Sequence, residues 1–159
     1  MDPDLTPLTK LDEATAAAQL ACMNLLVAYC HHIDSGHASR NVDLFTEDGS
    51  LIARMEVGEN VDPAVDARGR LQLAAVFDER DRAVGRRTKH VSCNPRITFV
   101  SSDKGHGSST TVMYLLSAQD PFSATVAHSI TECEDVFLRG PLGEWRIASR
   151  SVRLVAGRL

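Results

Sequence analysis

Residues 9–36, TKLDEATAAAQLACMNLLVAYCHHIDSG, carry the pattern that decides the fold. Thr9, with Asp12 three positions later, fits a helix N-terminus, and Ser35-Gly36 fits a helix end. Between them, apolar side chains recur at spacings of three and four, the period of a helix with one buried face: Leu11, Ala14, Ala18, Cys22, Leu25, Leu26, Tyr29, Cys30 and Ile33. The sequence therefore predicts a long amphipathic helix that ends at about residue 33.

The segments after this helix predict an α+β domain. We expect a short helix at about 38–45, a turn at Glu47-Asp48-Gly49, a strand within 50–57, a loop through Asn60 and Pro63, and a helix at about 68–77. Strand patterns separated by turns follow at about 88–100, 108–116, 125–138 and 144–154. Helices first and long strands later indicate a curled, cone-shaped antiparallel sheet packed around N-terminal helices, with a central pocket at its open end.

Composition and length narrow the classes of protein. The chain has 159 residues, 43% of them hydrophobic and 24% charged, which is typical of a globular protein. We expect one domain over 1–159, with about residues 1–8 as a flexible N-terminus. A net charge of -4 gives no reason to expect nucleic acid as a partner. No signal-peptide pattern and no apolar run of membrane-spanning length is present, so we expect a cytoplasmic protein without a membrane partner.

Two sets of residues that could suggest a metal or a disulfide framework do not have the spacing for either. Adjacent histidines in the stretch with His31, His32 and His37 point to different faces of a helix, so we expect no metal site. The cysteines have no close paired spacing and are expected to be reduced: Cys22, Cys30, Cys93 and Cys133. A run of arginines interspersed with acids is interpreted as a solvated face: Arg80, Arg82, Arg86 and Arg87.

Tyr29, Asp34 and His90 are the candidate catalytic residues. A carboxylate bonded to one ring nitrogen of a histidine fixes its tautomer and raises the basicity of the other nitrogen. Proton abstraction next to a carbonyl then needs a donor for the developing oxyanion, which the Tyr29 phenol could supply. Asp34 is unfavourable beside the negative end of a helix dipole, so its position calls for a partner, although it could instead simply end the helix. Tyr29 could equally be a core residue.

The strand that carries His90 alternates between polar and apolar side chains. Residue by residue, the period of two places His90, Ser92, Asn94, Arg96 and Thr98 on one face and Val91, Cys93, Pro95, Ile97 and Phe99 on the other. The polar face could line a wet cavity or meet solvent. Periodicity alone leaves both possibilities open.

Three segments carry a resemblance to a known family: YCHHIDSGHASRNVDLFTEDGSLIA (29–53), TKHVSCNPRI (88–97) and EWRIASRSVRL (144–154). Together they resemble the SnoaL-like proteins of the nuclear-transport-factor-like superfamily, which have an α+β cone fold. The match covers nearly the whole chain. Its motif positions are Asp34, Gly36, Phe45, Asp48-Gly49, Thr88, His90 and Asn94.

The resemblance implies several activities. The superfamily includes dehydratases, isomerases, polyketide cyclases and non-catalytic dioxygenase subunits, and the dehydratase branch looks closest. Its members use an Asp-His pair, and in the bile-acid type also a tyrosine, at positions corresponding to Asp34, His90 and Tyr29. Scytalone dehydratase has a further histidine on the next strand, where residues 109–119 offer Tyr114 and Ser117 but no histidine. The substrate of that enzyme is therefore not implied.

On this basis we expect a lyase or isomerase, dehydratase-like, that needs no metal or organic cofactor and acts on a small, mostly apolar, carbonyl-bearing substrate. The residues expected to contact this substrate are Phe45, Asn94, Tyr114 and His128. Alternatives are a non-catalytic small (beta) subunit of an aromatic-ring dioxygenase, a ligand-binding module, or a polyketide cyclase. Cone-fold proteins usually associate through the outer face of the sheet, which implies a homodimer or homotrimer.

Overall fold

The computed structural model describes residues 12–54, 63–83, 87–116 and 126–157 of the chain, and the expected flexible N-terminus lies outside these ranges. Helices and strands follow in the order α1 (Glu13–Asp34), η1 (Ala38–Leu44), β1 (Phe45–Arg54), β2 (Pro63–Arg68), α2 (Gly69–Arg82), β3 (Arg87–Ser101), β4 (Lys104–Leu116), β5 (Ser129–Arg139) and β6 (Trp145–Gly157). None of these helices is long and apolar enough to cross a membrane.

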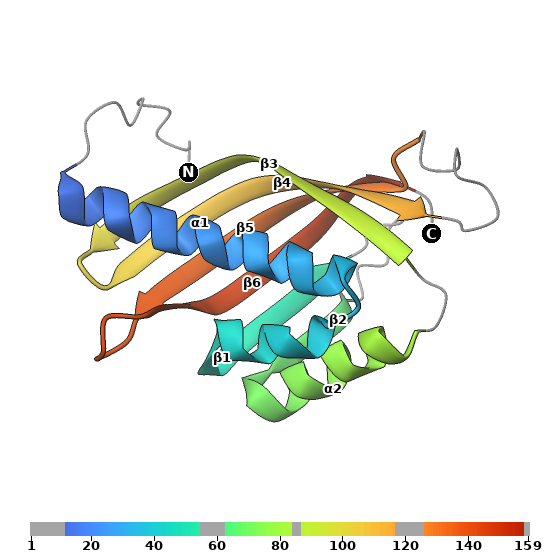
Figure 1. Ribbon diagram of the computed structural model, residues 1–159, viewed down its shortest axis with the longest axis horizontal. Helices are drawn as coiled ribbons and strands as arrows, with labels where there is room; N and C mark the ends of the chain where they lie inside the picture. The colour runs from blue at the N-terminus through green and yellow to red at the C-terminus, as the bar shows by residue number, and fades with distance from the viewer. Residues whose placement is uncertain (1–11, 55–62, 84–86, 117–125, 158–159) are drawn as a thin grey trace.

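The strands form a six-stranded, curled and unclosed sheet in the order β2-β1-β6-β5-β4-β3, and α1 lies across its concave face (Figure 1). The α+β class and the cone-like arrangement are as predicted. One pairing differs from a purely antiparallel sheet, because β1 runs parallel to β6. After β1 the chain forms the edge strand β2 and then α2, which carries it to the far edge at β3, so the first and last strands meet inside the sheet.

The long predicted helix is present, with a different start. Asp12 is its N-cap and accepts a hydrogen bond from the backbone N–H of Thr15 at 2.9 Å, so Thr9 is not the cap. The buried side chains of α1 lie on the predicted stripe: Cys22, Leu26 and Cys30. They pack into a core between the helices and the sheet that includes Phe45, Leu73, Phe77, Phe137 and Ile147.

Two predictions between β1 and α2 are wrong. Glu47-Asp48-Gly49 is part of β1, where the pairing register with β6 shifts between Phe45 and Ser50, so the expected turn is a bulge within the strand. Pro63 begins β2, which was expected to be loop. A proline is tolerated at the first residue of an edge strand, because the missing N–H bond is not needed there.

A second bulge changes the faces of β3. Cys93 pairs with Thr110 and Arg96 with Ser108, so β3 has one residue more than β4 in this interval. Asn94 has a φ of 52°, in the left-handed region that asparagine tolerates. The sequence pattern placed His90 and Ile97 on opposite faces of the strand. In the structure both face inward, His90 toward the pocket and Ile97 into the core, so the predicted alternation is wrong beyond the bulge.

Candidate active site

A pocket of about 500 Å³ opens between the C-terminal end of α1, α2 and the inner face of the sheet. This volume suits a small organic molecule. Much of the wall is apolar, with Leu51, Val65, Val76, Phe77, Met113, Val152 and Leu154. The polar and charged side chains that interrupt it include Tyr29, Arg80, His90, His128, Thr131 and Arg150. Polar and charged side chains thus lie within an otherwise apolar pocket wall.

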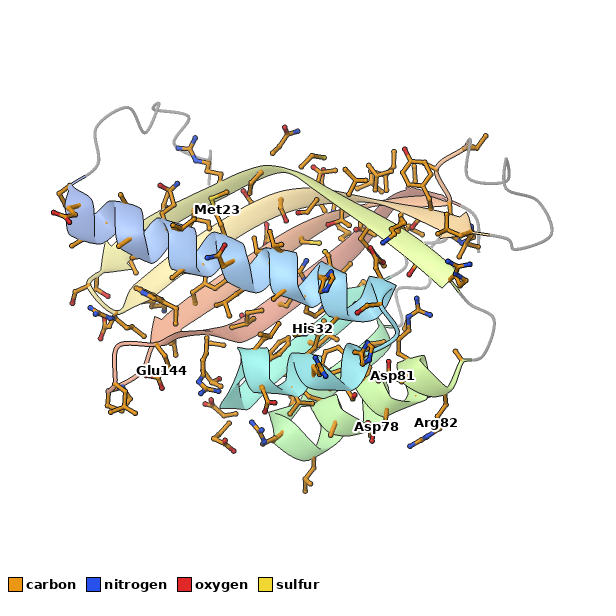
Figure 2. All side chains as sticks on the ribbon, in the orientation of Figure 1. Met23, His32, Asp78, Asp81, Arg82 and Glu144 are labelled. Atoms are coloured by element: carbon orange, nitrogen blue, oxygen red, sulfur yellow. The ribbon has the colours of Figure 1, made fainter. Side chains whose placement is uncertain are left out.

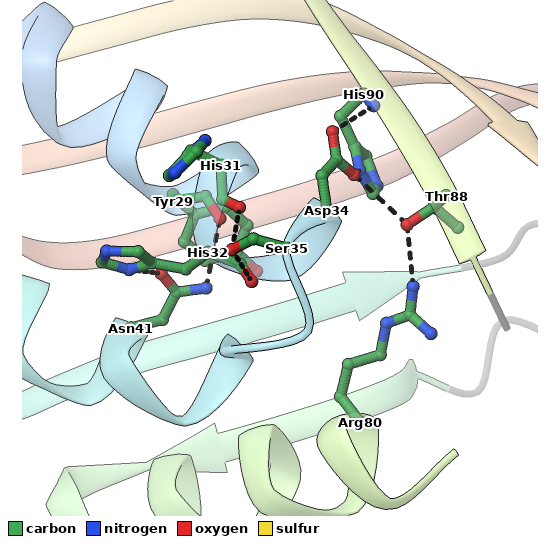
Figure 3. A network of polar contacts seen from close by, with 9 residues as sticks. All are labelled: Tyr29, His31, His32, Asp34, Ser35, Asn41, Arg80, Thr88 and His90. Atoms are coloured by element: carbon green, nitrogen blue, oxygen red, sulfur yellow. Dashed lines mark hydrogen bonds and ion pairs between the residues drawn. The ribbon is translucent and has the colours of Figure 1, made fainter. Parts of the chain in front are cut away.

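Asp34 and His90 are brought together by the fold. The last residue of α1 faces the start of β3, and His90 Nδ1 lies 2.6 Å from Asp34 Oδ1 (Figure 3). The backbone N–H of His90 also donates to Asp34 Oδ2 at 2.8 Å. The two side chains are 7% and 15% exposed, and His90 lines the pocket. The partner that the helix-end position of Asp34 called for is therefore His90.

Thr88 completes the surroundings of the Asp34 carboxylate. Its hydroxyl donates to Asp34 Oδ1 at 3.2 Å, and its oxygen accepts from Arg80 Nη2 at 3.0 Å (Figure 3). An ionised carboxylate accepts hydrogen bonds and cannot donate them. Surrounded by donors, Asp34 favours the imidazole form with the proton on Nδ1, which leaves Nε2 of His90 as the basic nitrogen.

Tyr29 lines the pocket one turn before the end of α1, as expected. Its ring makes edge contacts with Phe45 and Phe77, at centroid distances of 6.4 and 6.0 Å. Burial raises the pKa of Tyr29 to about 12, against the opposing charge of Arg150. The phenol therefore stays protonated at neutral pH and is available as a hydrogen-bond donor.

A buried ion pair beneath Tyr29 was not predicted. Arg150 Nη1 donates to both carboxylate oxygens of Asp135, at 2.9 and 3.0 Å, and its guanidinium lies 4.5 Å from the centre of the Tyr29 ring. Burial disfavours the charged form of Arg150, but Asp135 outweighs it and the pKa of Arg150 is raised. The guanidinium stays cationic in the pocket wall. The sequence held one signal, since Asp135 lies between the inward-facing Cys133 and Phe137 of one strand.

Of the four expected substrate contacts, His128 lines the pocket. The other three do not. Phe45 is fully buried in the core behind Tyr29, and Asn94 is exposed at the β3 bulge. Tyr114 follows Met113, which lines the pocket, so strand alternation places Tyr114 on the outer face of the sheet.

The last turn of α2 also differs from what the sequence predicted. Arg80 was expected in a solvated face, yet it lines the pocket and bonds Thr88. Its neighbour Asp81, labelled in Figure 2, accepts from the backbone N–H groups of Ala38 and Ser39, at 2.6 and 2.9 Å. These bonds join α2 to the start of η1. Arg82 is solvated as expected.

His32, near the end of α1, has a structural role. His32 Nδ1 lies 2.9 Å from Oδ1 of the buried Asn41, whose amide donates to the Tyr29 carbonyl at 3.3 Å (Figure 3). These bonds attach η1 to the end of α1. In the part of the chain that the structure describes, no three His, Cys, Asp or Glu side chains are grouped to hold a metal ion.

Residues 14–151 match the family of the SnoaL-like domain, and the chain belongs to this family. Solved structures with the same fold include a proposed scytalone dehydratase from Novosphingobium aromaticivorans DSM 12444, with 18% identity, a TM-score of 0.73 and coverage of 92% of this chain and 89% of that one. The beta subunit of a proposed aromatic-ring-hydroxylating dioxygenase from the same organism has 17% identity, a TM-score of 0.77 and coverage of 92% and 95%.

ActVI-ORFA from Streptomyces coelicolor is similar at 18% identity and a TM-score of 0.69, over 87% of this chain and 98% of that one. At identities this low, the structural similarity shows a common fold and no common activity. A search of curated proteins gave no match.

Proposed function

We propose that this SnoaL-like protein is a lyase or isomerase that removes a proton next to the carbonyl of a small, mostly apolar substrate. The observation that carries the proposal is the Asp34–His90 pair, joined at 2.6 Å, largely shielded from solvent and placed in the wall of an apolar pocket. A base with a fixed tautomer beside an apolar cavity is what such a proton transfer requires.

The residues divide the reaction between them. Nε2 of His90 takes the proton from the carbon next to the carbonyl. The electron pair of the broken C–H bond forms a C=C bond, and the π pair of the carbonyl moves onto its oxygen to give an enolate. The Tyr29 hydroxyl donates a hydrogen bond to this oxyanion, and the cationic Arg150 beneath the Tyr29 ring favours the same negative charge. Asp34 holds the imidazolium that forms.

The second half of the reaction decides the product. If the substrate has a hydroxyl group β to the carbonyl, the proton on His90 passes to that hydroxyl, the C–O bond breaks, and water leaves with formation of a C=C bond. If the substrate instead has a C=C bond between its β and γ carbons, the enolate is conjugated with that bond, and return of the proton to the γ carbon gives an isomer. Neither route needs a group beyond these side chains and the substrate.

Two alternatives use the same pocket differently. A polyketide cyclase would form the same enolate, which would then attack a second carbonyl of the substrate. A non-catalytic subunit or ligand-binding module would need the pocket but not the pair. The enclosed, directly bonded Asp34 and His90 support the enzyme, because exposed or separated side chains would have no means of acting together.

A panel of β-hydroxy ketones of graded size tests the proposal, with enone absorbance as the readout. We expect turnover by the native protein and a loss of about 10²- to 10⁴-fold in kcat for His90→Gln and for Asp34→Asn. His106→Gln, at an exposed position on β4, is the control and retains the native rate. Co-purification with a larger partner, with no turnover of any panel member, would favour the non-catalytic subunit.

A further inference from the structure

We propose that Arg80 and Thr88 are positioning residues that hold the Asp34–His90 pair in its reactive arrangement. The proposal rests on the proposed function of the pair. Arg80 comes from α2, Thr88 from β3 and Asp34 from α1, so three elements far apart in the sequence meet at one carboxylate (Figure 3). From the sequence, Arg80 was assigned to solvent, and Thr88 was a motif position without an assigned function.

The direction of these hydrogen bonds follows from the chemistry of the groups. A guanidinium has donors and no acceptor, so Thr88 Oγ1 accepts from Arg80 at 3.0 Å. A hydroxyl has one proton, and that of Thr88 then points to Asp34 Oδ1 at 3.2 Å. Arg80 therefore decides which way the Thr88 hydroxyl is oriented. Thr88 is 2% exposed, so water does not compete readily for its proton.

Thr88 gives the Asp34 carboxylate a hydrogen-bond donor that does not belong to His90. Asp34 accepts from the ring Nδ1 and the backbone N–H of His90, and both of these donors belong to the residue that Asp34 is meant to orient. The Thr88 hydroxyl is a donor from a separate side chain. Without it, the carboxylate keeps its bonds to His90 but loses the contact that ties it to α2.

The helix turn that carries Arg80 is itself anchored. Asp81 accepts from the first two backbone N–H groups of η1, Ala38 and Ser39. Val76 and Phe77 of the same helix line the pocket together with Arg80. The wall that contacts a substrate and the residue that orients the base thus belong to one anchored element. Thr88 is not among the lining residues, so it acts on the base through Asp34, and Arg80 takes part in the same positioning through its hydrogen bond to Thr88.

The first test needs no substrate. In the full-length protein labelled with ¹⁵N-histidine, the Hδ1 resonance of His90 reports the hydrogen bond to Asp34. We expect a sharp, water-protected Hδ1 signal in the native protein, and a signal broadened by faster exchange in Thr88→Val and Arg80→Gln. Thr88→Ser restores the hydroxyl and is expected to restore the sharp signal. Unchanged exchange in both Thr88→Val and Arg80→Gln would overturn the proposal.

The second test uses turnover once a substrate is in hand. Thr88→Val is expected to lower kcat by about 10- to 100-fold with KM little changed, because a displaced base costs rate more than binding. Thr88→Ser is expected to recover most of kcat. A change in KM alone would contradict a positioning role. Because the NMR measurement does not depend on catalysis, absence of turnover would overturn the proposed function and leave the test of this pairing intact.

Discussion

Asp34 is placed where a carboxylate is ordinarily unfavourable, at the last residue of a helix and largely buried. His90 and Thr88 provide the donors that compensate for this position. Residues in such settings are retained for function more often than for stability. The same is true of Tyr29, which keeps a hydroxyl within an aromatic cluster where phenylalanine would pack equally well.

Two buried thiols and the buried phenol of α1 predict a loss of stability at high pH. Burial raises the pKa of Tyr29 to about 12, of Cys22 to about 12 and of Cys30 to about 11, from ordinary values of 10.0, 9.0 and 9.0. The unfolded chain loses these protons first, so the free energy of unfolding should fall as pH rises above about 9 and keep falling until about 12.

Urea denaturation at a series of alkaline pH values measures this effect. Cys22→Ala is expected to reduce the fall above pH 9, and Tyr29→Phe to reduce it above pH 10, since each removes one of the protons concerned. A stability that stays constant over this range in the native protein would show that the three groups are not buried as described.

The β3 bulge is a case where an element departs from a regular pattern for a local reason. Asn94 takes a φ of 52°, which costs a β-branched residue about 1–2 kcal/mol. We expect Asn94→Val to lower the free energy of unfolding by about that amount, whereas Asn94→Gly should be nearly neutral because glycine adopts the same φ without strain. Equal effects of the two substitutions in urea titrations would argue against the bulge.

The buried Asp135–Arg150 ion pair between β5 and β6 allows single and double variants to be compared. Arg150→Met should cost about 3–5 kcal/mol, because it leaves Asp135 charged and unpaired in the core. The double variant Arg150→Met with Asp135→Leu should recover most of this loss, since it removes both charges. If the double variant were as unstable as the sum of the two single variants, the two side chains would not interact as the structure has them.

Local patterns explain which elements could be predicted. The period of α1 and the alternation of the late strands are properties of short segments, and those elements formed as expected. The parallel pairing of β1 with β6 depends on how distant segments meet, which no local pattern contains. The β3 bulge reverses the faces of the residues that follow it, because one extra residue shifts the alternation of side chains by one position.

The same distinction applies to the candidate site. The pairing of Asp34 with His90 was expected from the family resemblance and from the need of a carboxylate at a helix end for a partner, whereas the strand alternation alone left the direction of His90 open. Arg150 and Arg80 were missed, since arginine is usually exposed. The burial of Arg150 and the place of Arg80 in the pocket wall depend on partners from other elements. Tyr114 and Asn94 were expected to contact the substrate, and the sheet geometry places them elsewhere.

The outer face of the sheet leads to a proposal about the assembled protein. Tyr114 belongs to this face, and α1 covers the opposite, concave one. We propose that copies of the chain associate through the outer face. Light scattering coupled to size exclusion should give two or three times the mass of one chain, and Tyr114→Glu should shift it toward one. A native protein with the mass of a single chain would contradict this.

The fold as a whole combines an apolar pocket, a histidine held by a carboxylate and a protonated phenol, and proton abstraction is the activity that we propose for this combination. Solvent deuterium incorporation tests this most directly. Small cyclic ketones are incubated with the protein in D₂O, and mass spectrometry follows deuterium at the carbon next to the carbonyl. We expect exchange catalysed by the native protein and lost by about 10²-fold or more in His90→Gln. Exchange at the same rate in both proteins, or none with any ketone, would contradict the proposed role of the Asp34–His90 pair.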